Sequence, residues 1–220
     1  MIRSFFISDL HGHVDRYEKL ILFIRTHKPK LVFFGGDLLP HGMHRNTVND
    51  FTVDFLYFHF NNLMQEMGED YPRIYLILGN DDPRAQENKF IELAETGVWH
   101  YLHDRKDDFA GFTFYGYAND PPTPFRFKDW ERYDVSRYVD PGCIPPEEGF
   151  HSLEPMVDMA NATILEDLKQ LTGKGDMGKS VFLFHSPPYK TYLDRAGLDG
   201  MMVDHVPMDV NVGSIAIRRF

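Results

Sequence analysis

Short apolar runs alternate along the chain with segments in which apolar residues recur at helical spacing. The runs cover residues 2–7, 31–34, 74–78 and 181–184, and runs of this length are typical of buried strands. Between the runs, apolar positions three or four residues apart predict helices. The expected helices cover residues 17–24, about 47–67, 84–96 and 156–171. This pattern predicts helices packed on a sheet.

The second half of the chain is less regular. Residues 98–102 and 112–117 alternate like two strands joined across the charged stretch 104–108. Residues 118–155 are rich in proline and aromatic residues, and so long a loop is typical of a lid or binding rim. An aromatic-anchored excursion on the surface is the alternative. Residues 213–220 have the pattern of a short helix capped near Ser214.

Residues 173–180 match the P-loop pattern letter for letter, from Gly173 to Ser180. A P-loop follows a strand and opens a helix, so that the helix amides face the phosphates. Here the expected order is helix, loop, strand. We therefore interpret these residues as a connecting turn.

Polar side chains of metal-ligand type follow each of the four predicted strands. Asp9 and His11 follow the first, Asp37 the second, Asn80 the third and His185 the fourth. Any one of them alone would more often mark an ordinary turn or a satisfied loop residue. Ligands of α/β proteins gather at the carboxyl ends of strands, so the repetition favours a site. If the extended conformation persists to His11, the side chains of Asp9 and His11 point the same way.

Composition narrows the range of partners. The 220 residues suit one domain and are 43% hydrophobic and 25% charged, with a net charge of −10. This charge argues against binding a nucleic-acid backbone or an anionic membrane, and a phosphate substrate would need a local cation. The single cysteine, Cys143, fits a reducing compartment. No apolar run reaches membrane-spanning length, so we expect a cytoplasmic protein; its oligomeric state is left open.

Four motifs, in this order, resemble those of the calcineurin-like metallophosphoesterase superfamily. They are Asp-Leu-His at 9–11, Gly-Gly-Asp at 35–37, Gly-Asn-Asp-Asp at 79–82 and His-Ser-Pro-Pro at 185–188. The resemblance spans the chain, although only the motifs are specific. It implies an α/β (α+β) fold, a four-layer α/β/β/α sandwich with two mixed β-sheets, the metallo-dependent phosphatase fold.

The resemblance also implies a binuclear metal site. Asp9 and His11 would bind the first ion, Asp37 would bridge both, and Asn80 and His185 would bind the second. Two divalent ions about 3.5–4 Å apart activate a hydroxide for in-line attack on phosphorus. Asp37 and Asn80 would thus be catalytic, and Asn80 and His41 could contact the substrate. The ligand types suit manganese first, with iron, zinc or nickel as alternatives.

Two departures from the family pattern bear on activity. Asp81 stands where the family commonly has a histidine that assists the phosphate and the leaving group, and branches that lack this histidine tend toward phosphodiester substrates. The family's Gly-His-x-His motif does not occur in this sequence. We expect that the chain lacks the last strand and its ligands, unless His205, Asp209 or a neighbouring chain compensates.

The sequence therefore predicts a metal-dependent phosphoesterase acting on a small phosphoester, with a phosphodiesterase favoured. Two alternatives stay open. One is a non-catalytic or truncated metallophosphoesterase-like binding module, because motif residues are lost. The other is a phosphomonoesterase or protein phosphatase, which would share the metals but would be expected to use the motif histidine.

Overall fold

The computed structural model describes residues 2–40, 49–155, 158–194, 202–203, 206–207 and 211–220. The chain divides into two compact units. The first contains residues 1–118 and 177–183, and the second contains residues 119–176 and 184–220. The candidate ligands at positions 9, 11, 37 and 80 belong to the first unit, whereas His185 belongs to the second.

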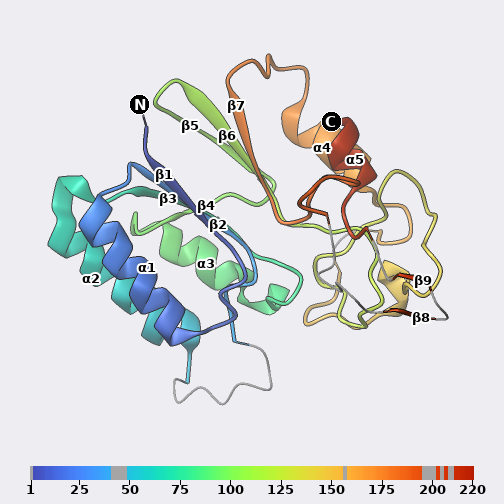
Figure 1. The fold of residues 1–220 in the computed structure, drawn as a ribbon, viewed down its shortest axis with the longest axis horizontal. Helices are drawn as coiled ribbons and strands as arrows, with labels where there is room; N and C mark the ends of the chain where they lie inside the picture. Colours follow the sequence, from blue (N-terminus) through green and yellow to red (C-terminus); the bar gives the residue numbers. More distant parts are fainter. Residues whose placement is uncertain (1, 41–48, 156–157, 195–201, 204–205, 208–210) are drawn as a thin grey trace. The chain divides into compact units, whose positions relative to one another are not determined.

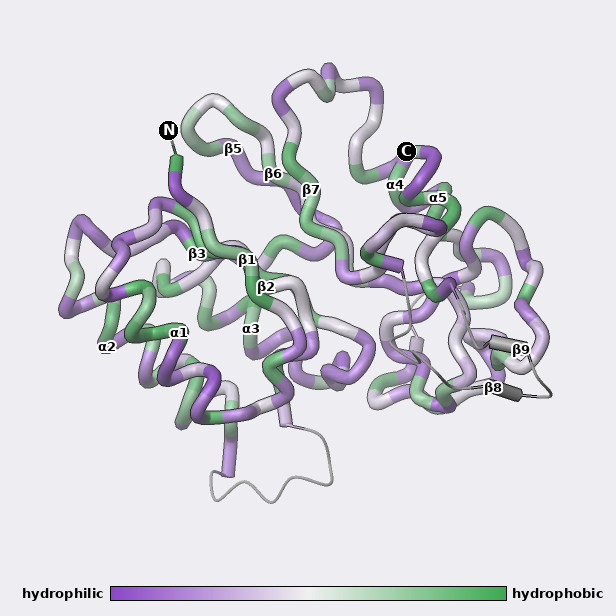
Figure 2. Tube along the Cα trace, viewed as in Figure 1, coloured by the Kyte–Doolittle hydropathy of each residue, from purple (hydrophilic) through white to green (hydrophobic). Residues whose placement is uncertain are grey.

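A parallel sheet with the strand order β1-β2-β3-β4 organises the first unit. The strands are β1 (Ser4–Ile7), β2 (Leu31–Gly35), β3 (Arg73–Ile77) and β4 (His100–Tyr101). Each of the three pairings is parallel, so β1, β2 and β3 end at the same edge of the sheet. Figure 2 shows β1 and β2 as largely hydrophobic stretches, as the apolar runs predict.

Helices cover one face of this sheet (Figure 1). They are α1 (Val14–His27), α2 (Phe58–Met67) and α3 (Glu87–Ala94), and short 3-10 turns lie at Gly68–Asp70 and Arg84–Gln86. Phe34 of β2 packs edge-on against Phe60 of α2 with 5.6 Å between the ring centroids. The helix expected over residues 47–67 proves to be α2 preceded by a π-helix, Phe51–Tyr57; residues 47 and 48 lie outside the described residues.

The other face of the parallel sheet packs against a second sheet with the order β5-β6-β7. Its strands are β5 (Arg105–Phe109), β6 (Phe112–Tyr117) and β7 (Ser180–Phe184). Phe33 and Tyr75 are register partners in β2 and β3. Both rings lie within 6 Å of the Phe114 ring of β6, at 5.8 and 4.8 Å. The α/β class with two sheets is therefore confirmed.

The strand pairing expected in this region is wrong. Residues 105–109, expected to be a connection, form β5 and pair antiparallel with β6. Residues 98–102 contribute β4 to the other sheet, where β4 pairs with β3. The charged residues of β5 are tolerated because this strand lies at a sheet edge, where Arg105, Lys106 and Asp108 remain exposed.

The second unit is mostly irregular. Its elements are a 3-10 turn at Pro146–Glu148, α4 (Ile164–Thr172), β8 (Met202–Val203), β9 (Val206–Pro207) and α5 (Ile215–Arg219). Of the helix expected over residues 156–171, residues 156 and 157 lie outside the described residues, and α4 begins at Ile164, because the Thr163 hydroxyl caps it by accepting from the Glu166 amide. Since α4 precedes the glycine-rich turn and β7 follows it, the order is helix, loop, strand, and the P-loop interpretation is excluded.

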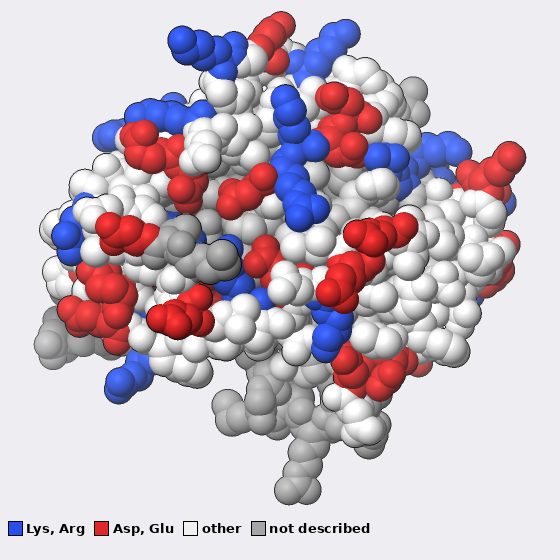
Figure 3. All heavy atoms as spheres, turned by 180° about the vertical axis from the view of Figure 1, so that it is seen from behind, with Lys and Arg blue, Asp and Glu red and all other residues white. Residues whose placement is uncertain are grey.

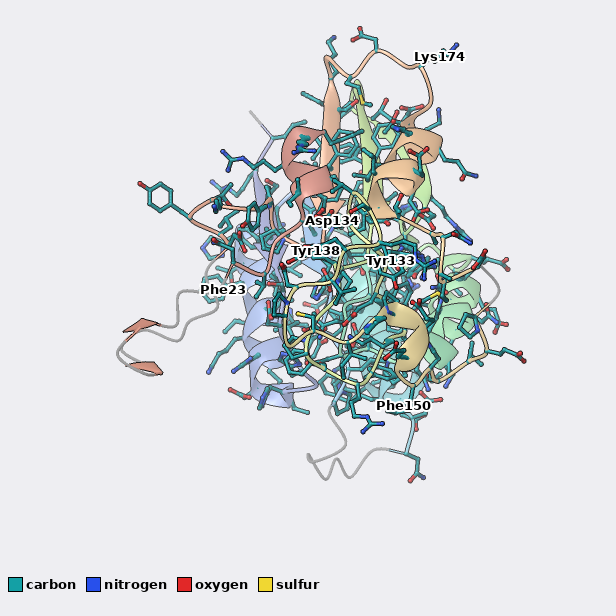
Figure 4. The ribbon with its side chains drawn as sticks, turned by 90° about the vertical axis from the view of Figure 1, so that its right-hand side faces the viewer. Phe23, Tyr133, Asp134, Tyr138, Phe150 and Lys174 are labelled. Atoms are coloured by element: carbon teal, nitrogen blue, oxygen red, sulfur yellow. The ribbon has the colours of Figure 1, made fainter. Side chains whose placement is uncertain are left out.

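The proline-rich segment 118–155 has a buried interior of its own. The Lys128 ammonium, fully buried, lies 2.6 Å from a carboxylate oxygen of Glu131, which is also buried. Thr123 donates both its amide and its hydroxyl to Glu131. Asp134 accepts from Ser214, Ile215 and Ala216 and so holds the first turn of α5 (Figure 4). Movement of this segment as a lid stays a prediction.

Charge is mixed on the surface. Figure 3 shows lysine and arginine side chains scattered among aspartate and glutamate side chains on the face that it presents. No helix in the described ranges is long and apolar enough to cross a membrane. The expected cytoplasmic location and the expected partners stay predictions.

Candidate metal centre

The segments that follow β1 and β2 are joined by backbone hydrogen bonds beyond the ends of the strands. The Asp9 amide donates to the Gly36 carbonyl at 3.1 Å, and the His11 amide donates to the Asp37 carbonyl at 2.8 Å. The Gly12 amide continues the series to the Leu38 carbonyl at 2.9 Å. The polar residues after the two strands therefore lie side by side.

Three of these residues adopt a left-handed backbone conformation. The φ angles are +57° for Asp9, +45° for His11 and +55° for Asp37. The extended conformation therefore does not persist to His11, and the expected period-two alternation is wrong as the reason why these side chains converge. They converge because paired turns, held by the hydrogen bonds above, fold both segments over the strand ends. Non-glycine residues in this conformation are uncommon and cluster at functional sites.

Asp9, His11 and Asp37 form a group in which one ligand atom from each lies within 4.8 Å of the others. The His11 Nε2 atom lies 4.0 Å from an Asp9 oxygen and 3.9 Å from an Asp37 oxygen. The Asp37 side chain is only 6% exposed, whereas that of Asp9 is 63% exposed. The group thus has a buried carboxylate at its base and an accessible carboxylate at its rim.

The segment after β3 completes the acidic surroundings of this group. The Asp81 amide donates to Asp37 Oδ1 at 2.9 Å, which fixes one oxygen of the buried carboxylate. The Asp81 carboxylate lies 3.8 Å from His11 Nδ1 and accepts from the Asn80 side-chain amide at 3.3 Å. Asn80 is therefore adjacent to the group, and Asp81 occupies the place beside the imidazole.

Asp82 is a positioning residue to which we assigned no role from the sequence. Its carboxylate is completely buried and accepts from the amides of Leu38, Leu39 and Gly79 at 2.7–3.0 Å. It therefore ties the segment that carries Asp37 to the segment that carries Asn80. Burial, together with the charge of Asp37, raises the pKa of Asp82 to about 6 against the opposing effect of these amides.

Two further site residues, His185 and His41, were predicted from the sequence. His185 is in the second unit, where its Nε2 atom lies 3.6 Å from an Asp120 carboxylate oxygen and both side chains are 10% exposed. His41, predicted to contact the substrate, lies outside the described residues, as do His205 and Asp209. The roles of Asn80, His41 and His185 stay predictions.

The donor set of the Asp9–His11–Asp37 group fits a divalent metal ion. Two carboxylates and one imidazole are ligands that manganese, iron, zinc and nickel accept. The buried Asp37 carboxylate lies close to the Asp81 amide, and its charge raises the pKa of Asp82 nearby. A cation at this position would relieve the repulsion among these carboxylates.

Comparison with known proteins agrees with this site. The family model for calcineurin-like phosphoesterases matches residues 2–207, and this chain belongs to that family. Metal-dependent hydrolysis of phosphoesters is the chemistry that this family suggests for the chain. The curated proteins contain no match.

Among solved structures, that of TT1561 from Thermus thermophilus is 15% identical and covers 88% of this chain and 72% of its own, with a TM-score of 0.49. A second solved chain is 16% identical, covers 96% of this chain and 76% of its own, and also has a TM-score of 0.49. Since both scores lie below 0.5, membership rests on the family match.

Proposed function

We propose that this chain is a metal-dependent phosphodiesterase that hydrolyses a small phosphodiester with the help of two divalent metal ions, manganese foremost. The observation that carries the proposal is the convergence of Asp9, His11 and Asp37 at the ends of two paired parallel strands. Divalent ions bound there would supply positive charge to the phosphoryl oxygens and lower the pKa of the attacking water.

Each residue of the candidate site has its own proposed role. Asp9 and His11 would hold one cation, and Asp37 would serve as a ligand of both cations. The Asp81 amide and the surrounding backbone hydrogen bonds keep Asp37 in its orientation. Asn80 and His185 are proposed as ligands of the second cation, and His41 as a substrate contact, on the strength of the family motifs.

The choice of a diester over a monoester rests on Asp81. A phosphodiester carries one negative charge at neutral pH, whereas a phosphomonoester carries nearly two, because its second pKa is about 6. The Asp81 carboxylate, 3.8 Å from His11, repels the more highly charged anion more strongly. Exchange of this carboxylate for a neutral amide should therefore favour the monoester.

The test uses the 220-residue protein stripped of metal and reloaded with manganese, nickel or zinc. Hydrolysis of bis-p-nitrophenyl phosphate and p-nitrophenyl phosphate is measured, and metal stoichiometry is read by mass spectrometry on the same samples. We expect two bound ions and faster diester turnover in the wild type. Asp37→Ala should lose both, whereas Asp108→Ala, which removes an exposed carboxylate of β5, should lose neither.

A further variant tests the substrate preference. Asp81→Asn should raise the ratio of monoester to diester turnover, and an unchanged ratio would contradict the charge argument. Faster monoester than diester turnover by the wild type would favour a phosphomonoesterase or protein phosphatase. Bound metal with no turnover of either ester would favour a binding module. Two metals retained by Asp37→Ala would refute the ligand assignment itself.

A further inference from the structure

Arg16 lies beside the candidate metal centre. It is in the first turn of α1, and its Nη1 atom donates to the main-chain carbonyl oxygen of Asp9 at 2.7 Å. Asp9 is the exposed carboxylate of the metal-ligand group and has a left-handed backbone. The guanidinium is therefore anchored next to a candidate ligand by a hydrogen bond that leaves the carboxylate of Asp9 available.

Arg16 differs from a second arginine of α1 in its ionic contacts. In the described ranges its guanidinium has no carboxylate partner within 4.0 Å, and the residue is exposed. Arg25, on the same helix, makes a two-pronged pair with Glu66 at 2.7 Å. Since a guanidinium has five N–H donors, most of those of Arg16 remain available to an anion.

The candidate metal centre lies among acidic residues, so a nearby cation would favour the binding of an anionic substrate. Asp9, Asp37, Asp81 and Asp82 all lie on the three strand-end segments, and a net charge of −10 adds to the repulsion of anions. A planar guanidinium binds two oxygens of one phosphoryl group in a fork, which gives both attraction and orientation.

We propose that Arg16 binds the non-bridging oxygens of the substrate's phosphoryl group and of the phosphomonoester product. This inference rests on the proposed function, because it takes the neighbouring group as the place where the phosphoester is held. It assigns substrate binding to a residue outside the motifs and makes Arg16 a determinant of affinity for the phosphoryl group.

The experiment compares the wild type with Arg16→Met and Arg16→Lys. It measures the affinity and stoichiometry of manganese, the affinity of the manganese-loaded protein for inorganic phosphate by calorimetry, and KM and kcat for bis-p-nitrophenyl phosphate. Lys19→Met is the matched control, because it removes one exposed positive charge from the same helix. Thermal unfolding of each variant checks that the fold is retained.

We expect Arg16→Met to weaken phosphate binding by about 10- to 100-fold, the range for loss of a hydrogen bond to a charged group. Manganese affinity and stoichiometry should stay at wild-type values. The KM for bis-p-nitrophenyl phosphate should rise as well. In both phosphate affinity and KM, Arg16→Lys should lie between the wild type and Arg16→Met, because it keeps the charge but loses the forked guanidinium. Lys19→Met should match the wild type.

Other outcomes overturn the proposal in distinguishable ways. Weakened manganese binding with unchanged phosphate affinity at full metal loading would show that Arg16 only braces the Asp9 backbone. Equal losses of phosphate affinity in Arg16→Met and Lys19→Met would show a general charge effect. A wild type that binds neither manganese nor phosphate would refute the proposed function, and with it this assignment.

Discussion

Replacing Gly12 with alanine should destabilise the protein and disturb the metal centre together. Gly12 has a φ of +66°, and a Cβ built there would lie 2.7 Å from three atoms of Pro40, two of them backbone atoms. A left-handed alanine costs about 1–2 kcal/mol, and overpacking against an immobile neighbour typically adds about 1–3 kcal/mol. We therefore expect the free energy of unfolding to fall by about 2–5 kcal/mol.

The clash should also displace the candidate metal ligands. The Gly12 amide donates to Leu38, next to Asp37 in sequence, and Gly12 follows His11 directly. Separating Gly12 from Pro40 therefore moves the two ligand segments apart. Manganese affinity, measured by titration of metal-free protein, should fall in Gly12→Ala, and urea unfolding of the same metal-free protein gives the stability change.

Gly97→Ala is the control, because Gly97 also has a positive φ, +84°, and its added Cβ would meet no atom within 4 Å. It isolates the backbone contribution, about 1–2 kcal/mol, and should leave manganese affinity unchanged. If Gly12→Ala is no more destabilising than Gly97→Ala, or if both bind manganese like the wild type, the close approach to Pro40 does not hold the ligand segments.

Three further changes probe the scaffold, each by urea unfolding of metal-free protein. Asp134→Ala should cost about 2–4 kcal/mol, since three donors at the start of α5 lose a charged acceptor; a loss below about 0.5 kcal/mol would contradict this. Thr163→Ala should cost about 1 kcal/mol through loss of the α4 cap, whereas Thr163→Ser should not. Burial tends to raise the pKa of Asp107, but hydrogen bonds from Tyr75 and Arg73 hold it below its ordinary value of 3.8. The stability that this carboxylate adds is present above about pH 4 and is lost as the pH falls further, so the wild-type advantage over Asp107→Asn should shrink in acid and persist at pH 7.

The apolar runs were sufficient to predict β1, β2, β3 and β7. In β2 and β3 most residues are buried, as expected of strands covered on both faces, whereas β1 and β7 are edge strands that are apolar but only partly buried. β5 could not be found in this way. It is an edge strand of mostly exposed charged residues, and its pairing with β6 depends on backbone groups that no side-chain pattern reveals.

The first residue of α4 could have been predicted from a capping motif, although the apolar periodicity pointed to an earlier start. Thr163 and Glu166 are three residues apart, the spacing of a capping box, and the helix begins at the next residue after Thr163. Apolar spacing alone extended the expected helix back to residue 156. The π-helix before α2 carries no comparable signal, since Phe51 and Phe55 are spaced as in an ordinary helix.

The candidate ligands were predictable by residue type and by position after a strand, but the cause of their convergence was not. Asp9 and His11 meet Asp37 through left-handed turns and cross-strand hydrogen bonds, which depend on chain segments far apart in sequence. The clamp formed by Asp82 depends on three amides from two segments. Long-range backbone contacts of this kind leave no local pattern.

The most direct test of the central claim is manganese binding to metal-free wild type and Asp37→Ala, measured by calorimetry together with diesterase activity on the same samples. The structure places Asp37 at the buried base of the ligand group. We expect two ions and bis-p-nitrophenyl phosphate turnover in the wild type, and loss of both in Asp37→Ala. Equal metal binding by the two proteins would contradict the assignment of this group as the metal centre.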